Sequence, residues 1–452
     1  MNSGDATLQL IRLSVFLIGA TVLVTLLARR INLPYTVALV AFGIAAGAVS
    51  QPLRVDITPQ LVLVVLLPAL IFEATYRTDF AKLRPSIVGV VLLAGPGVFI
   101  SAALIAAALY FGAGLPWPEA IVVGAMLSAT DPAAVIATFK RLRSPRRLAT
   151  LVEAESVFND GTGIVLFALA VDFVARPVGP AEAGLAFVSV VLLSGALGAA
   201  AGYVASRILP SVGDHLIEVS LSVVLAYGTY LVADGFHQSG VIATAVAGIV
   251  LGTYGRRNGL SPKTEEALDT VWEFVAFLAT AFIFLVVGFS IAAHSLVDVA
   301  VPIAWAVVAT LVGRAVIVYG LVGGWRIVER ARRARRPAPN SPAEVVGSES
   351  GLPLGWLHVL FWSGLRGAVS TALALSLPLD FPNRAQLQGI TFGVVLFTLV
   401  VQATTAELVL ARWGRKPADE RRSSPNSRPK AKKKPAVPAE LASRPTDAGS
   451  ES

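Results

Sequence analysis

Cysteine is absent from this chain, and charged residues are scarce. The lack of Cys among 452 residues excludes disulfides and thiolate metal sites. Charged residues make up only 15% of the chain against 55% hydrophobic residues, and the mean hydropathy is +0.70. Apolar runs of about 20 residues recur from end to end, each long enough to cross about 30 Å of hydrocarbon. The composition therefore excludes an ordinary soluble protein and predicts an all-α polytopic membrane protein.

The apolar runs predict thirteen transmembrane spans, which occupy residues 1–411. Their approximate limits are 7–28, 34–50, 57–76, 86–112, 118–138, 152–173, 184–208, 216–234, 238–254, 268–290, 297–323, 354–377 and 386–411. Small residues are dense in the seventh span, from Ser194 to Ser206, which favours close helix packing and, less strongly, a dimer contact.

Basic residues alternate between the two sides of the predicted membrane. The odd-numbered connections hold 20 Lys and Arg, with Arg207 counted in the seventh, whereas the N-terminus and the even-numbered connections hold three. This bias predicts a multi-pass protein of the cell membrane with its N-terminus outside and its C-terminus in the cytoplasm. The net charge of +8 thus indicates topology and contact with membrane lipid, not nucleic-acid binding.

Two hydrophilic stretches interrupt the pattern of spans. Residues 326–351 are basic and then rich in Pro, Ser and Glu, and residues 412–452 are rich in Pro, Lys and Ser. Because neither has apolar periodicity, we expect a disordered cytoplasmic loop and a disordered basic cytoplasmic tail.

A polar wedge opens the sixth span, in the sequence LVEAESVFNDGTGIVLFALA. On a helix Glu155 and Asn159 lie one turn apart, and Ser156 and Asp160 lie one turn apart on the neighbouring face. A charge within hydrocarbon costs several kcal/mol, so a deep carboxylate indicates a functional site whose partner must be found.

The fifth and twelfth spans are expected to be interrupted at mid-membrane. Pro132 follows Asp131 in the fifth span and should break the helix there, and Gly364 and Gly367 flank Arg366 in the twelfth. The two breaks are seven spans apart, and an odd offset implies opposite orientations, which is the geometry of inverted-repeat transporters. We expect Asp131 to face exposed N–H groups and Arg366 to face exposed carbonyls of the half-helices.

Four motifs in this order and spacing give the chain a family resemblance. They are LLPALIFEA, SATDPAAV, ESVFNDGTGIVLF and GLRGAVSTALAL. Together they resemble the monovalent cation:proton antiporters of the sodium/proton exchanger family, over residues 10 to 411. The resemblance implies an inverted-repeat homodimer with two discontinuous crossing helices, a mobile core of spans 4–6 and 11–13, and a scaffold of spans 1–3 and 7–10.

The resemblance also implies roles for individual residues. Asp160 corresponds to the ion-binding aspartate, and Ser156, Thr130 (through its backbone) and Glu73 resemble its accessory ligands. Asn159 resembles the residue that steadies the unwound fifth span. Glu155 and Arg366 resemble a buried structural ion pair. No cofactor is implied beyond the transported Na⁺ or Li⁺ and H⁺.

The predicted chemistry follows from one carboxylate for which a proton and a cation compete. Because desolvation disfavours its charged form, an aspartate at position 160 can hold either a proton or a partly dehydrated cation, and its oxygen neighbours suit a hard ion such as Na⁺ or Li⁺. Asn159 cannot titrate, and no Lys lies in any predicted span. We therefore expect electroneutral 1:1 exchange by alternating access, not an enzymatic activity.

Three other functions are compatible with some of these residues. A K⁺/H⁺ antiporter of the same fold would fit the same residues. An intramembrane aspartyl protease could use Asp131 and Asp160 as a dyad, but its usual GxGD motif is absent. A passive channel would need a continuous polar pore or ligands from several subunits. Two other charged residues lie within predicted spans. Glu273 is expected to form a hydrogen bond in the scaffold. Arg314 needs an acid or backbone carbonyls as its partner, and the sequence does not identify which.

Overall fold

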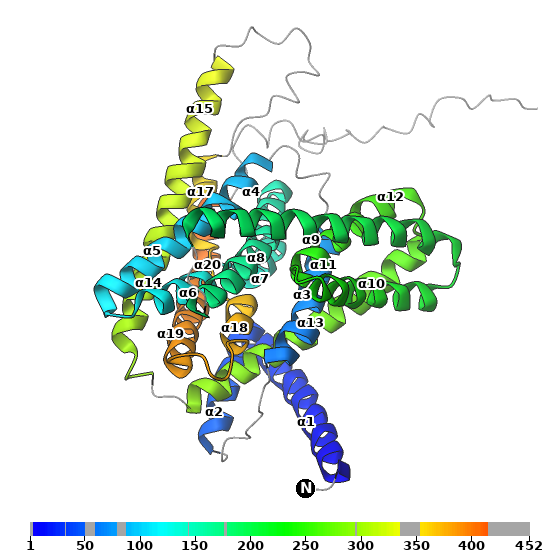
Figure 1. Ribbon diagram of the computed structural model, residues 1–452, viewed down its shortest axis with the longest axis horizontal. Helices are drawn as coiled ribbons and strands as arrows, with labels where there is room; N and C mark the ends of the chain where they lie inside the picture. Colours follow the sequence, from blue (N-terminus) through cyan, green and yellow to red (C-terminus); the bar gives the residue numbers. More distant parts are fainter. Residues whose placement is uncertain are drawn as a thin grey trace, which may run out of the picture. The chain divides into compact units, whose positions relative to one another are not determined.

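Helices make up nearly all of the chain that the structure describes (Figure 1). The structure, a computed structural model, describes residues 3–31, 33–49, 59–78, 87–142, 144–175, 179–293, 296–334 and 353–414. Within these ranges there is no strand, which confirms the all-α prediction. The described residues belong to one compact unit, Met1–Arg415.

The elements follow one another with short connections. In the first half they are α1 (Ser3–Arg30), α2 (Tyr35–Val49), η1 (Leu61–Leu66), α3 (Leu67–Arg77), α4 (Ile87–Ala94), α5 (Pro96–Ala113), α6 (Trp117–Met126), α7 (Ala133–Leu142), α8 (Arg146–Ala175), α9 (Pro180–Ile208) and η3 (Leu209–Ser211). In the second half they are α10 (His215–Gly235), α11 (Gly240–Val250), η4 (Leu251–Gly255), α12 (Arg256–Asn258), α13 (Pro262–Ala293), α14 (Ala300–Ala315), η5 (Val316–Val322), α15 (Gly323–Ala334), α17 (Leu354–Trp362), α18 (Ala368–Leu375), α19 (Arg384–Phe397), η6 (Thr398–Ala403) and α20 (Thr404–Trp413).

Seven of the described helices are long and apolar enough to cross a membrane unaided. Ile87–Ala113 and Pro262–Ile291 are two of them, with 27 and 30 residues. Other predicted spans consist of shorter helices, such as α6 and α7 in the fifth and α17 and α18 in the twelfth. Length and apolarity therefore identify a polytopic membrane protein, while the number of thirteen spans stays a prediction.

The helices pack most closely within two groups. In one group α2 packs on α13, and α3, α9 and α10 pack on α11. In the other group α5 packs on α6 and α14, α8 packs on α4 and α6, and α17 packs on α20. A shared apolar cluster joins the groups, with Leu39 and Phe284 from the first and Val123 and Leu373 from the second.

Glycines allow the first group to pack backbone to backbone. A Cβ atom at Gly43 of α2 would lie 2.8 Å from Cα of Gly288 on α13. A Cβ at Gly198 of α9 would lie 2.1 Å from the carbonyl oxygen of Ala243 on α11, and one at Gly202 would lie 2.8 Å from that of Ala247. The small residues predicted to favour close packing in the seventh span therefore form a helix contact inside the chain.

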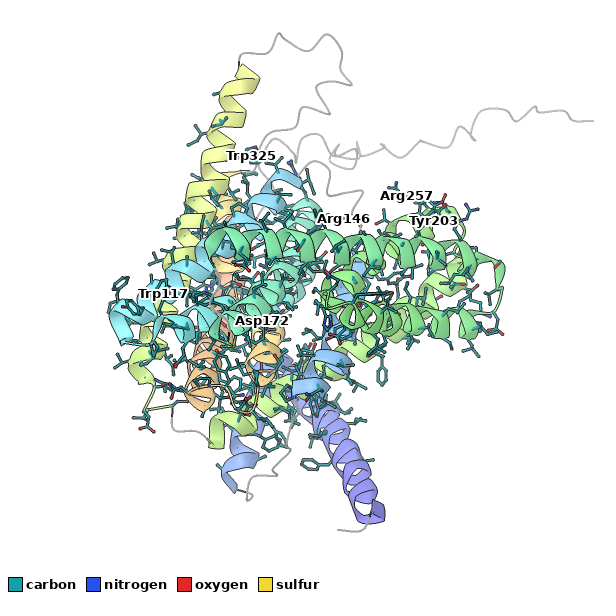
Figure 2. The ribbon with its side chains drawn as sticks, viewed as in Figure 1. Trp117, Arg146, Asp172, Tyr203, Arg257 and Trp325 are labelled. Atoms are coloured by element: carbon teal, nitrogen blue, oxygen red, sulfur yellow. The ribbon has the colours of Figure 1, made fainter. Side chains whose placement is uncertain are left out.

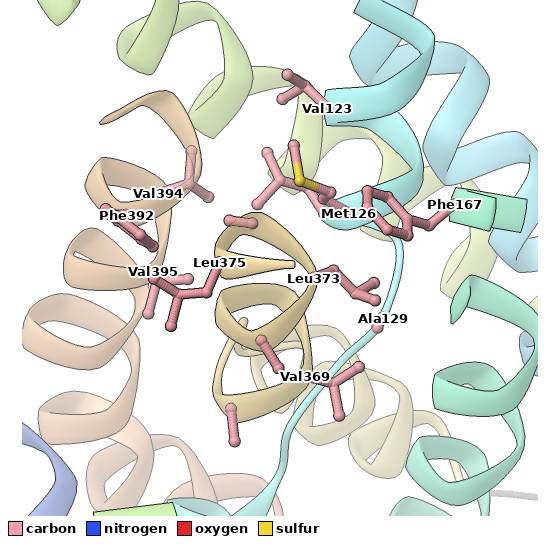
Figure 3. Close-up of a cluster of buried hydrophobic side chains, with 14 of the residues drawn as sticks. Val123, Met126, Ala129, Phe167, Val369, Leu373, Leu375, Phe392, Val394 and Val395 are labelled. Atoms are coloured by element: carbon pink, nitrogen blue, oxygen red, sulfur yellow. The ribbon is translucent and has the colours of Figure 1, made fainter. Parts of the chain in front are cut away.

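The half-helix α18 lies in the centre of the second group. Figure 3 shows Val369, Leu373 and Leu375 of α18 among apolar side chains that include Met126, Phe167 and Phe392. All eight residues of α18 are buried. This packing fixes the position of a helix that is too short to be stable by itself.

The helix α15 begins at Gly323 and continues to Ala334, so residues 326–334 are helical rather than part of the predicted disordered loop. It projects beyond the neighbouring described helices (Figure 1), and Trp325 lies near its base (Figure 2). Arg and Ala favour helix, which explains the extension of the span. The rest of the predicted loop, 335–351, and the tail from residue 415 lie outside the described residues.

Candidate ion-binding site

The fifth span is broken where the sequence predicts. The helix α6 ends at Met126, and α7 does not begin until Ala133. The residues between them include Thr130, Asp131 and Pro132. Pro132 lacks a backbone donor and disfavours helical geometry at Asp131, so the segment is left with backbone groups that need partners.

The twelfth span is also broken, between Trp362 and Ala368. Glycine is required at positions 364 and 367, because a charged side chain lies against the backbone at each of them. A Cβ atom at Gly367 would lie 2.1 Å from Oδ2 of Asp131, and one at Gly364 would lie 2.7 Å from Nε of Arg314. Close approach, more than backbone flexibility, is therefore what glycine provides here.

The two breaks bind each other directly. The backbone N–H of Asp131 donates to the carbonyl of Leu365 at 2.8 Å, and the N–H of Ala368 donates to Oδ2 of Asp131 at 3.0 Å. The carboxylate thus lies at the N-terminus of α18, where exposed N–H groups and the helix dipole favour a negative charge. This contact of Asp131 was predicted from the sequence and is confirmed.

Arg366 makes the complementary contact at the end of α6. Its Nη1 atom donates to the carbonyls of Ser128 and Ala129 at 2.9 and 2.8 Å, and the side chain is only 1% exposed. Thr398, the first residue of η6, accepts from the N–H of Arg366 and donates to its carbonyl. The prediction that Arg366 faces exposed carbonyls is therefore confirmed.

The predicted pairing of Glu155 with Arg366 is wrong, because Glu155 pairs with Arg314. Nη2 of Arg314 donates to Oε2 of Glu155 at 2.8 Å, and Nη1 donates to Oε1. Arg314 also donates to the carbonyl of Leu360 near the end of α17, at 3.0 Å from Nε and 2.7 Å from Nη2. A planar guanidinium can serve a carboxylate in bidentate fashion, and Arg366 is already occupied by the carbonyls after α6.

These polar side chains surround a small internal cavity. About 10 Å³ of it is open to the centre of a water molecule. Its polar lining consists of Ser101, Ser128, Thr130, Glu155, Asn159, Arg314 and Arg366. The buried pair and both crossing helices therefore face one polar space in the second group of helices.

The helix α8 holds the unwound segment of the fifth span through Thr130. Ser156 Oγ donates to the carbonyl of Thr130 at 2.7 Å. Asn159 Nδ2 donates to Oγ1 of Thr130 at 2.6 Å, and the N–H of Thr130 donates to Asn159 Oδ1 at 3.1 Å. Asn159 therefore steadies the broken span with both ends of its amide, as expected.

Asp160 follows Asn159 on α8 and lies one helical turn after Ser156. Its Oδ1 atom is buried and has no hydrogen-bond partner among the residues that the structure describes. A buried carboxylate oxygen without a donor is costly unless a proton or a cation accompanies it. Ser156, one turn before Asp160, brings its hydroxyl to the carbonyl of Thr130, and neutral oxygen atoms of this kind suit a hard cation.

Glu73 lies on α3, in the first group of helices. Its Oε1 atom lies 2.9 Å from Nη1 of Arg77, one helical turn later. The same Nη1 lies 3.3 Å from Oε2 of Glu273 on α13. The sequence prediction missed both contacts of Arg77, although the spacing of four residues between Glu73 and Arg77 on a helix could have indicated the first.

Broken helices that cross at a buried carboxylate define a secondary transporter. Comparison with known proteins identifies the family. The model of the family described as "Sodium/hydrogen exchanger, transmembrane" matches residues 17–412. The chain belongs to this family and is a cation/proton antiporter. The relatives described below are named as Na⁺/H⁺ antiporters, which are transporters and not enzymes.

Several relatives are similar to this chain over most of its length. The Na⁺/H⁺ antiporter NhaH of Halobacillus aidingensis is 36% identical over 88% of this chain and 96% of its own. The Na⁺/H⁺ antiporter ApNhaP of Aphanothece halophytica is 36% identical over 85% of this chain and 70% of its own. The structure of MjNhaP1 from Methanocaldococcus jannaschii, a sodium proton antiporter, matches with a TM-score of 0.70 at 19% identity and covers 91% of this chain and 100% of its own. That likeness confirms the antiporter fold.

Proposed function

We propose that this antiporter exchanges Na⁺ or Li⁺ for H⁺ by alternating access, with the two ions competing for Asp160. The observation that carries the proposal is the buried Oδ1 of Asp160, which lacks a hydrogen-bond donor within the described residues. Ser156 and the carbonyl of Thr130 supply neighbouring oxygen atoms, which suit a hard cation. Glu73 is proposed as an accessory ligand from the other group of helices.

Exchange is proposed to be electroneutral, one cation for one proton. A single carboxylate becomes neutral when it binds either Na⁺ or H⁺, so both loaded forms of the site carry the same charge. The neighbouring amide of Asn159 cannot titrate, and its two ends are engaged with Thr130. The site therefore has one negative charge, which binds one cation or one proton in each transport step.

The same arrangement supports the proposed division into a mobile core and a scaffold. The helices that carry the crossing, α4 to α8, α14 and α17 to α20, pack mainly on one another. Movement of this group against α2, α3 and α9 to α13 would carry Asp160 from one side of the membrane to the other. A Cys pair across the two groups that abolished exchange only when crosslinked would support the division, whereas full exchange in the crosslinked protein would contradict it.

The protein is further proposed to be a homodimer in the cell membrane, with its N-terminus outside and its C-terminus in the cytoplasm. The absence of native Cys allows a test with single substitutions. An impermeant thiol reagent should label Ser3→Cys in intact cells and Ser450→Cys only after lysis; the reverse pattern contradicts this topology. Light scattering in detergent should give twice the chain mass of 47.2 kDa, and a single chain mass would contradict the dimer.

Transport by purified protein in proteoliposomes tests the central proposal. We expect Na⁺ and Li⁺ to dissipate an imposed pH gradient, and the apparent KM for Na⁺ to rise as pH falls because protons occupy the same carboxylate. Asp160→Asn should fold and show no cation-driven proton movement, whereas Asp172→Asn, later on the same helix, serves as a control. Normal exchange by Asp160→Asn would end the assignment.

Comparison of cations in the same assay separates the alternatives. Preference for K⁺ over Na⁺ would identify a K⁺/H⁺ antiporter of the same fold. A protease dyad is not supported, because the carboxylate of Asp131 is bound to the N-terminus of α18 and the chain belongs to a family of transporters. A linear, pH-insensitive conductance would indicate a channel in place of a carrier.

A further inference from the structure

Arg77 lies between two carboxylates that come from different helices. Its Nη1 is 2.9 Å from Glu73 on α3 and 3.3 Å from Glu273 on α13. One guanidinium nitrogen thus serves two acids, of which the nearer is the proposed accessory ligand. The two acids therefore compete for the positive charge of Arg77.

The three side chains differ in their exposure to the surroundings. The side chain of Glu73 is 20% exposed, that of Arg77 is 34% exposed and that of Glu273 is 66% exposed. Glu273 is the most exposed of the three side chains, and Glu73 is the least exposed. Because burial disfavours a carboxylate charge, Glu73 depends more than Glu273 on a nearby positive charge. Ion pairs at such exposure are weak enough to exchange.

Glu73 lies on a helix that reaches the proposed ion site, because α3 contacts α8, which carries Asp160. A second ion pair, between Arg256 on α12 and Asp269 on α13 at 2.5 Å, involves neither Glu73 nor Glu273. The contacts of Arg77 therefore provide the link between the proposed ligand and α13.

We propose that Arg77 is a positioning residue that holds Glu73 as its internal counter-ion and passes to Glu273 when a monovalent cation reaches Glu73. This inference rests on the proposed function, in which Glu73 is an accessory ligand. The cation replaces the guanidinium at Glu73, and Glu273 receives the displaced charge. Glu273 thereby sets how easily Glu73 becomes available.

Kinetics of Na⁺/H⁺ exchange in proteoliposomes test this transfer. In Glu273→Gln, Arg77 loses its alternative partner, and the KM for Na⁺ should rise about two- to fivefold with kcat unchanged, the range expected for a partly exposed ion pair. In Arg77→Gln, Glu73 loses its competitor and the KM should fall by a similar factor. In the double variant, Glu273→Gln should add nothing to Arg77→Gln.

Glu266→Gln is the matched control, because it removes one carboxylate from the same helix, α13, at a residue that is not among the acids acting on Arg77. An unchanged KM in Glu273→Gln, or an equal rise in Glu266→Gln, would overturn the transfer. A change in kcat and thermal stability with KM constant would make Arg77 a purely structural link. Failure of the proposed function appears separately, as exchange by Asp160→Asn; an unchanged KM in Glu73→Gln would remove the ligand role and this inference with it.

Discussion

Each charged side chain near the two broken helices binds a particular backbone or side-chain group. Asp131 accepts from the N-terminus of α18, and Arg366 donates to the carbonyls that follow α6. Arg314 serves both Glu155 and the carbonyl of Leu360. Because these groups lie in a membrane-spanning core, removing one partner leaves the other without solvent to replace it.

Substitution at Glu155 tests the pairing. Glu155→Gln should leave Arg314 with an uncompensated charge and cost about 3–5 kcal/mol of stability, seen as a lower unfolding temperature and lower yield. The double variant Glu155→Gln/Arg314→Gln should recover part of that loss, because the stranded charge is gone. If recovery occurred with Arg366→Gln and not with Arg314→Gln, Arg366 would be the true partner of Glu155.

Some contacts of these residues can be predicted from sequence, and others depend on how helices are rotated against one another. Pro132 fixes a break next to Asp131, and half-helix ends demand opposite charges, so the roles of Asp131 and Arg366 follow from local rules. The choice between two buried arginines for Glu155 does not, because it requires the relative placement of α8, α14 and α17. The position of Arg314 within a span predicts that it needs a partner, but only the packed helices show that this partner is Glu155.

At the scale of elements, glycine sets how closely the helices approach. Gly198 faces the backbone of α11, whereas a Cβ at Gly195, about one turn earlier on α9, would meet nothing within 4 Å. The sequence alone shows a run of small residues and predicts close packing, but not the partner helix. Packing on α11 explains the run within one chain.

Alanine at these two positions should therefore have different effects. Gly198→Ala should force α9 away from α11 and destabilise the protein by about 1–3 kcal/mol, the usual cost of overpacking. Gly195→Ala should be neutral or slightly stabilising, because alanine favours helix more than glycine does. Thermal unfolding of both variants in detergent is the measurement, and equal stability would show that the α9–α11 contact is looser than the structure indicates.

At the scale of the whole molecule, one carboxylate is proposed to carry both ions. The all-α membrane architecture could be predicted from apolar runs and the transporter class from the two interrupted spans, whereas the division into a core and a scaffold was implied only by the family resemblance. If both loaded forms of the site are neutral, the crossing step should move no net charge. Turnover of proteoliposomes at fixed pH and Na⁺ gradients should then be the same at imposed potentials of either sign. A potential dependence that matches net charge movement would contradict 1:1 exchange.

The hydrogen bonds between Asp131, Leu365 and Ala368 have a mechanical consequence. Neither interrupted span can form a continuous helix while its broken segment is hydrogen-bonded to the broken segment of the other span. We therefore expect the two breaks to keep their geometry during transport, although their backbone is irregular. If the two helix groups move as proposed, bending should occur at the borders between them, and the ion site should keep its shape.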